Sequence, residues 1–285
     1  MKASNPDIEK YDLIFGLGPA CSCTMSLRKA LLQHLSFPYD WIGPVENTTA
    51  YRHDVRLRAA QIAREFAGEG GEWLKPGDFQ HVETPPSAPR ECYINTWMQF
   101  RFIHDFPLGS DFAAEFPKIE AKYRRRCTRL LELIRQSRRV LLVRIDRPDL
   151  CVRTEIDDCH EAVRLLSEKF APVRFDLLLL RCEHGRDYGH RIETDHGGGV
   201  REIVFDYDDY DPTVPKFQPN VSLLARFLAG RYAVRDYRTR EERRAKARHD
   251  REKAYAKYAV TTWWQYRLAK MRRRLMKHFH YHDGK

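Results

Sequence analysis

Two continuous apolar runs constrain the fold of this chain more than any other feature. They are RVLLVRI, Arg139 to Ile145, and PVRFDLLLLRC, Pro172 to Cys182. Runs without alternation, rich in leucine and valine, are typical of strands that are buried on both faces of a parallel sheet. A shorter apolar run, Tyr11 to Phe15, predicts another such strand, and Arg201 to Asp206 predicts a further one.

Helical periodicity fills most of the intervals between these strands. Apolar residues recur at helical spacing after Cys21, from about Ala113 or Lys118 to Ser137, from Thr154 to about Phe170, and from Val221 to Ala233. Thr154 also has an acidic residue three positions later, the spacing of a capping box, which predicts that this helix starts there.

The aromatic and β-branched segment from Cys92 to Phe106 predicts one strand or a hairpin. Strands that alternate with helices indicate an α/β fold. We therefore predict a mostly parallel sheet with helices on both faces, followed by a basic helical extension at the carboxyl-terminal end.

The positive charge is concentrated in that extension. The 285 residues carry 50 Lys plus Arg and 40 Asp plus Glu. Residues 238–285 hold 16 of the basic and 5 of the acidic residues, a net charge of +11, which leaves 34 basic and 35 acidic residues for 1–237. We predict an α/β domain over 1–234 and a tail over 235–285. A domain with balanced charge argues against specific nucleic-acid binding.

Aromatic and basic side chains interleave in the tail. They include Tyr255, Tyr258, Trp263, Tyr266, Arg267 and Lys270. This composition suits a peripheral anchor on an anionic membrane surface, and it suits an acidic polymer such as glycan or RNA equally well. The alternative is an ordinary helix whose aromatic side packs on the domain.

The cysteine pattern and the amino-terminal segment favour a reducing, cytoplasmic location. The seven cysteines are an odd number without zinc-finger spacing, and no apolar signal-peptide core is present. If the tail binds a membrane, that membrane surface is the inner face. The sequence has no Walker A motif, and Gly16-x-Gly18 lacks the third glycine of a dinucleotide site, so we predict no cofactor and no metal.

Cys21 lies where the first strand passes into the first helix. The turn from Gly16 to Pro19 ends the strand, and Ser22 or Thr24 can cap the helix. The first N–H groups of a helix are unpaired and its macrodipole is positive there, so a thiolate is favoured over a thiol. The alternative is that Cys21 is a small buried apolar residue.

Small residues near Cys21 leave room for a substrate to approach the backbone. The unpaired N–H groups there can hold an oxyanion or a phosphate. The candidate substrate-binding residues are Gly18, Pro19, Ala20, Ser22 and Trp41.

A cysteine nucleophile needs a base and a group that orients the base. His104 is the leading base because it closes an apolar aromatic strand, where an imidazole without a partner is costly. Asp105 follows it directly and points to the opposite face of an extended chain, so Asp40 and Asp146 are the better orienting candidates. The alternative for His104 is a structural hydrogen bond at a strand end.

The order of these motifs resembles a bacterial family of papain-like cysteine peptidases that is otherwise a domain of unknown function. The matching segments are Leu17 to Cys21, Pro38-Tyr39-Asp40-Trp41, His104-Asp105-Phe106 and Lys122 to Arg126, within residues 11–182. Pro19-Ala20 stands where Ser-Asn is usual, and Tyr39 where Phe is usual. The resemblance implies a thiol hydrolase that acts on a peptide or acyl substrate, with Cys21 as nucleophile and His104 as base.

Two other functions remain open. The strand, Gly-turn, Cys and helix are also similar to the GSCFA group of esterase relatives, which act on acylated glycans. In that case the catalytic acid and base would be Asp195 and His196, which come late in the chain. Cys21 would replace a serine whose position is taken here by Ala20. The other function is non-catalytic: a protein of a surface-glycan pathway that binds an anionic sugar or phosphate at the Gly turn and helix start.

Overall fold

The computed structural model divides into two compact units, Met1–Tyr237 and Arg238–Lys285. The residues that it describes are 8–19, 21–45, 53–67, 74–83, 90–146, 153–183, 192–206, 221–257, 262, 264–268 and 270–271. All the described strands belong to the first unit.

The first unit is built on a five-stranded sheet with the strand order β2-β7-β8-β10-β9. Its strands are β2 (Leu13–Gly16), β7 (Arg139–Asp146), β8 (Arg174–Glu183), β10 (Val200–Asp206) and β9 (Ile192–Asp195). The first four are parallel, and β9 turns back antiparallel to β10. Leu142 of β7 is in register with Phe15 of β2 and Leu177 of β8.

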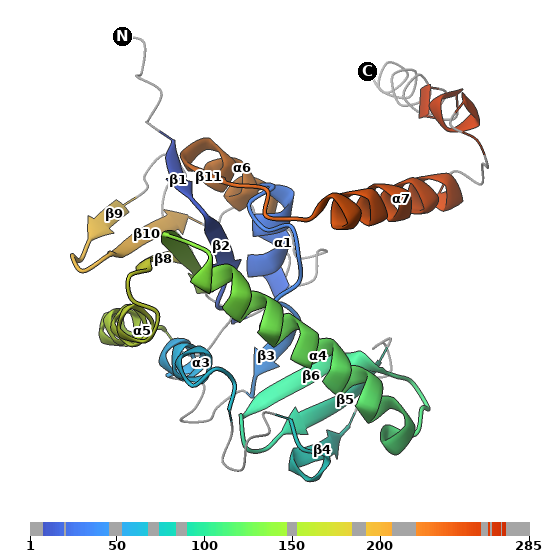
Figure 1. Cartoon of the computed structure of the whole chain (residues 1–285), viewed down its shortest axis with the longest axis horizontal. Helices are drawn as coiled ribbons and strands as arrows, with labels where there is room; N and C mark the ends of the chain where they lie inside the picture. The colour runs from blue at the N-terminus through green and yellow to red at the C-terminus, as the bar shows by residue number, and fades with distance from the viewer. Residues whose placement is uncertain are drawn as a thin grey trace. The chain divides into compact units, whose positions relative to one another are not determined.

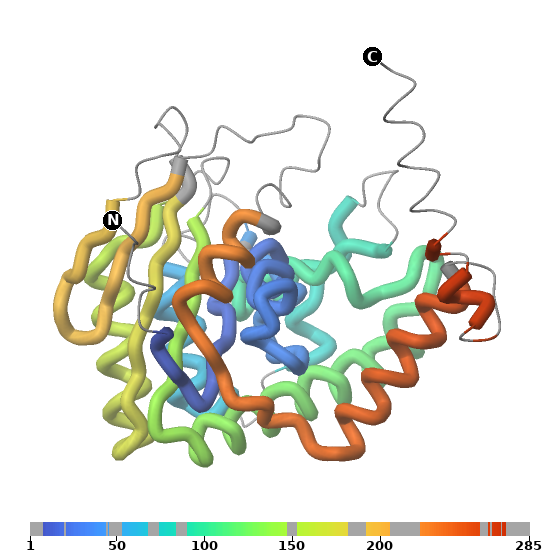
Figure 2. Tube along the Cα trace, turned by 90° about the horizontal axis from the view of Figure 1, so that it is seen from above, coloured from blue at the N-terminus to red at the C-terminus, as the bar shows by residue number. Residues whose placement is uncertain are grey.

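Helices cover both faces of this sheet because its inner strands are apolar on both sides. α1 (Cys21–Lys29) and α6 (Val221–Arg231) cover one face, and α3 (Asp54–Ala63), α4 (Phe112–Arg135) and α5 (Ile156–Lys169) the other. α1 and α6 lie side by side (Figures 1 and 2). Along β7, Leu141 and Val143 pack into the cluster with α1 and α6, and Val140 and Leu142 into the other cluster.

A second sheet is antiparallel throughout, in the order β3-β6-β5-β4. Its strands are β3 (Ile42–Pro44), β6 (Phe100–Pro107), β5 (Arg90–Asn95) and β4 (Phe79–Val82), the last preceded by the 3-10 helix η1 (Pro76–Asp78). α4 lies across this sheet (Figure 1), where Tyr123 meets Phe102 at 5.3 Å and Phe116 meets Phe79 at 5.4 Å between ring centroids. The side chain of Asp111 caps the start of α4.

The predicted fold class was therefore wrong. The sequence predicted one mostly parallel sheet, whereas the structure has a mixed five-stranded sheet, an antiparallel four-stranded sheet and a two-stranded sheet. The aromatic segment supplies β5 and β6, and β3 and β4 extend this hairpin into a sheet of its own. β3 and β4 have three and four residues, too few for a periodic pattern to appear in the sequence.

The two-stranded sheet joins segments from opposite ends of the first unit. β1 (Glu9–Tyr11) pairs in parallel with β11 (Tyr232–Val234). The Tyr11 hydroxyl donates a hydrogen bond to Asp176 (2.9 Å), which attaches β1 to the central sheet.

The second unit begins with α7 (Arg240–Lys257). Its start is a capping box: the Glu242 N–H donates to Thr239 Oγ1 (3.1 Å), and the Thr239 N–H donates to Glu242 Oε2 (2.9 Å). Thr262 and Gln265 form the same reciprocal pair before the helical residues 264–268 and 270–271. In the described part of the chain, no helix combines the length and the apolar character that crossing a bilayer requires.

Candidate functional site

Cys21 is the first residue of α1 and follows the turn that closes β2. Backbone hydrogen bonds fix this turn to β7: the Leu17 N–H donates to Val143 O (2.8 Å), and the Ile145 N–H donates to Gly18 O (3.3 Å). Gly18 has a φ of +86°, a conformation that glycine adopts without strain. The sheet therefore sets the position from which α1 starts.

Cys21 is partly exposed, whereas four other cysteines are buried. Those are Cys23, Cys92, Cys127 and Cys159. Burial raises the pKa of Cys23 and that of Cys159 to about 12. Cys23 also donates its S–H to Val143 O (3.3 Å) beneath the helix. Among these five thiols, Cys21 is thus the one most accessible to a reagent.

A residue on the same side of α1 as Cys21 contacts Trp41. Thr24 and Arg28 lie three and seven positions after Cys21 and therefore share its side of the helix. The Arg28 guanidinium lies 5.5 Å from the centroid of the Trp41 ring. On Trp41 the His104 ring packs edge-on, with 5.8 Å between the centroids and 82° between the planes. Trp41 thus lies between the helix of the predicted nucleophile and the predicted base.

His104 is an exposed residue of β6. Partial burial of the ring lowers the pKa of His104. Within the described residues, neither ring nitrogen has a hydrogen-bond partner. A neutral imidazole with an available nitrogen can accept a proton, which is what a general base must do.

Asp40 is buried in the loop that follows α1 and receives several hydrogen bonds. Its donors are the Thr24 hydroxyl (3.0 Å), the Gln33 side-chain amide (2.8 and 2.9 Å) and the Phe37 N–H (2.8 Å). Arg28 lies 3.7 Å away. Burial raises the pKa of Asp40 in spite of these donors. This carboxylate fastens the loop that carries Trp41 to α1.

The other two candidate orienting carboxylates are also engaged away from the predicted base. Asp105 accepts a hydrogen bond from the Tyr123 hydroxyl (2.9 Å) and pairs with Lys122. Asp146 accepts hydrogen bonds from the Thr154 N–H and hydroxyl, each 2.7 Å. In the described structure none of Asp40, Asp105 and Asp146 bonds to His104, so the orienting residue stays a prediction.

The candidate substrate-binding residues lie around the turn. Gly18 and Pro19 are buried, and Pro19 O is 3.9 Å from where a Cβ on Gly43 of β3 would lie. Ser22 is buried, and its hydroxyl has no hydrogen-bond partner. Ala20 lies outside the described residues.

The acid and base of the esterase hypothesis lie at the β9–β10 connection. Asp195 accepts a hydrogen bond from the Gly197 N–H (2.8 Å), and His196 Nε2 is 3.0 Å from Glu202 Oε2. Both side chains thus have structural partners there.

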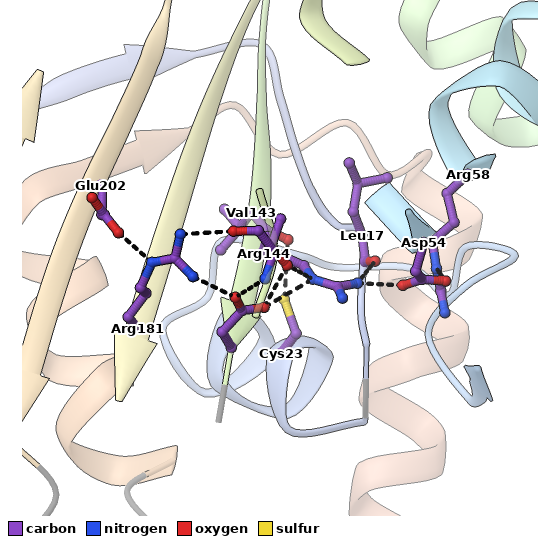
Figure 3. Close-up of polar contacts among 10 residues, drawn as sticks. Leu17, Cys23, Asp54, Arg58, Val143, Arg144, Arg181 and Glu202 are labelled. Atoms are coloured by element: carbon purple, nitrogen blue, oxygen red, sulfur yellow. Dashed lines mark hydrogen bonds and ion pairs between the residues drawn. The ribbon is translucent and has the colours of Figure 1, made fainter. Parts of the chain in front are cut away.

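A chain of buried ion pairs, which sequence analysis did not predict, crosses the carboxyl ends of β7 and β8 (Figure 3). Its members, in order, are Arg58, Asp54, Arg144, Asp146, Arg181 and Glu202. Arg144 also donates to Leu17 O (3.1 Å), so the ion pairs help to hold the turn before Cys21. The sequence signal was the presence of Arg144 and Arg181 within apolar strands, where a charge needs a partner.

Comparison with known proteins adds one distant relative. The chain is 20% identical over 208 residues to an uncharacterized protein of Acanthamoeba polyphaga mimivirus, which covers 70% of this chain and 91% of the relative. No family model matches the sequence, and no solved structure matches the fold.

Proposed function

We propose that this protein is a cysteine-dependent hydrolase that acts on an acyl or amide carbonyl. The observation that carries the proposal is the position of Cys21, the partly exposed first residue of a helix that follows a strand of the central sheet. Unpaired N–H groups and the helix dipole at such a position favour the thiolate. His104 acts as the base, and Trp41 positions it.

The proposed reaction has two steps. His104 takes the thiol proton, the Cys21 sulfur bonds to the carbonyl carbon, and the amine or alcohol leaves with that proton. Water then attacks the thioester while His104 takes a proton from it. The acid product leaves, and the proton returns to the Cys21 sulfur, which restores the enzyme.

We expect Cys21 to be the fastest cysteine in alkylation by iodoacetamide, about tenfold faster than the buried thiols and with an apparent pKa below about 8.5. The measurement is peptide mass spectrometry of native protein labelled at several pH values. His104→Ala should remove most of this advantage. His81→Ala is the matched control, because His81 is a second exposed strand histidine, paired with Glu91.

If Cys21 alkylates like an ordinary thiol, or if both histidine variants have the same effect, the hydrolase proposal is wrong. The non-catalytic binding hypothesis would then take its place. That hypothesis requires that Cys21→Ser leave the binding of an anionic sugar or phosphate unchanged.

A separate observation favours membrane binding by the second unit. Trp264, Leu268 and Met271 are spaced i, i+4 and i+7 in its helical residues, and they are 69%, 52% and 53% exposed. Residues of this spacing share one helix face. Arg267 and Lys270 lie between them, and residues 238–285 carry a net charge of +11. An apolar stripe with basic neighbours suits an anionic lipid surface better than RNA, which offers no apolar phase.

We expect the full chain to sediment with phosphatidylcholine vesicles that contain phosphatidylserine and not with pure phosphatidylcholine vesicles. The double variant Leu268→Ser/Met271→Ser should lower the affinity at least about tenfold, because it removes two side chains that enter the lipid. Leu108→Ser is the control, since Leu108 is an equally exposed leucine of the first unit. Binding to poly(U) RNA that survives the double substitution, with no vesicle binding, would identify an acidic polymer as the partner instead.

A further inference from the structure

Arg58 of α3 is a buried arginine whose guanidinium is held from three sides. Its side chain is 0% exposed, and its Nε donates to Asp54 Oδ1 (2.7 Å). The guanidinium lies 4.9 Å from the Tyr39 ring centroid and 4.7 Å from that of Phe100. These contacts fix the orientation of the group before any ligand arrives.

The two terminal nitrogens of Arg58 have no hydrogen-bond partner in the described structure. Together they carry four N–H donors, and leaving buried donors unpaired is costly. Arg58 is also the end member of the ion-pair chain. Asp54 divides its two oxygens between Arg58 and Arg144, so Arg58 shares its single carboxylate partner.

These nitrogens lie against the turn that leads into α1. A Cβ added to Gly18 would lie 2.9 Å from Arg58 Nη1 and 3.2 Å from Nη2, and Gly18 is three residues before Cys21. At the same helix start, the Ser22 hydroxyl is buried without a partner. The positive end of the α1 dipole and an incompletely neutralised guanidinium are therefore close together.

We propose that Arg58 Nη1 and Nη2 bind an oxyanion, a carboxylate or phosphate group, of the molecule on which the Cys21 site acts. A planar guanidinium matches the two oxygens of such a group, and the bonds are strong where water is excluded. Because Arg58 has no contact with solvent, an anion reaches it when the packing around the turn opens locally. The inference depends on the proposed location of the functional site but not on thiol chemistry.

The test compares iodoacetate with iodoacetamide at Cys21, two alkylating reagents of similar size of which only the first is an anion. Each Cys21 rate is divided by the rate of the same reagent with glutathione. On this scale, we expect Cys21 of the wild type to react about tenfold faster with iodoacetate than with iodoacetamide. Inorganic phosphate should abolish this preference, and in Arg58→Met the ratio of the iodoacetate rate to the iodoacetamide rate should fall to that of glutathione, whatever the absolute rates are. Arg56→Gln should keep it, because Arg56 lies on the same helix but is half exposed and pairs with Asp158.

The outcomes separate this inference from the proposed function. Alkylation of Cys21 by iodoacetamide without any preference for iodoacetate overturns the Arg58 inference alone. If Cys21 reacts with neither reagent, the hydrolase proposal fails, and thermal unfolding still tests Arg58: phosphate must raise the melting temperature more than chloride does at equal ionic strength. That rise must be absent in Arg58→Met. If this variant does not fold, a wild type that phosphate fails to stabilise overturns the inference.

Discussion

Replacing Arg144 with methionine is expected to lower the free energy of unfolding by about 3–5 kcal/mol. Arg144 is 3% exposed and lies at the centre of the ion-pair chain, where it pairs with Asp54 and Asp146. Methionine fills a similar volume but leaves two buried carboxylates with less compensation. It also removes the hydrogen bond to Leu17 O before the α1 turn. Urea unfolding followed by fluorescence and circular dichroism measures the change.

Arg164→Met is the matched control for this prediction. Arg164 also pairs with two carboxylates, Glu161 and Glu168, but on the exposed surface of α5. Exposed ion pairs contribute little because water and salt screen them, so we expect a loss below about 1 kcal/mol. Equal losses of unfolding free energy in Arg144→Met and Arg164→Met would mean that the buried ion pairs of Arg144 contribute no more to stability than exposed ones do.

The long elements of the fold were predictable because their sequence patterns are strong. The run from Arg139 to Ile145 predicted a strand, and β7 covers Arg139–Asp146. The helical pattern that starts at about Ala113 or Lys118 and ends at Ser137 corresponds to α4, which covers Phe112–Arg135 and is capped by Asp111. Continuous burial on both sides of a strand leaves a clear signal in composition.

Pairing between strands could not be predicted in the same way. Whether β5 and β6 join a parallel sheet or form another one depends on partners as short as Ile42–Pro44. Thr154 shows the same limit for a helix start: its hydroxyl donates to Asp146, and the N-cap of α5 is Glu155 instead. In both cases a contact outside the local sequence pattern overrides that pattern.

For the candidate site, too, the features set by local sequence were predictable and those set by tertiary contacts were not. The position of Cys21 at a helix start follows from a local strand–turn–helix pattern. The hydrogen-bond partners of the three candidate orienting carboxylates are set by which residues the fold brings close in space. In the structure these carboxylates, Asp40, Asp105 and Asp146, all have structural partners. Arg58 gave no sequence signal because an arginine on a short helix is ordinary until its burial is known.

Replacing Asp40 with asparagine is expected to lower the free energy of unfolding by about 2–3 kcal/mol at neutral pH. The groups that approach Asp40 from Thr24, Gln33 and Phe37 are all donors. The side-chain amide of asparagine has N–H groups of its own. It would point them at one of these donors, so buried donors would be left unpaired. Asp111→Asn is the control: Asp111 is an exposed helix cap, and asparagine caps equally well, so we expect little change.

The difference in stability between wild type and Asp40→Asn should also depend on pH. Burial raises the pKa of Asp40, so the folded state binds this proton at a higher pH than the unfolded state does. The contribution of the carboxyl group is therefore complete below its unfolded pKa of about 3.9, and it is lost as pH rises through the raised value. The stability gap should narrow as pH rises above about 4 in urea titrations. A gap that widens instead would mean that the donors around Asp40 outweigh its burial and hold the carboxylate charged in the folded protein.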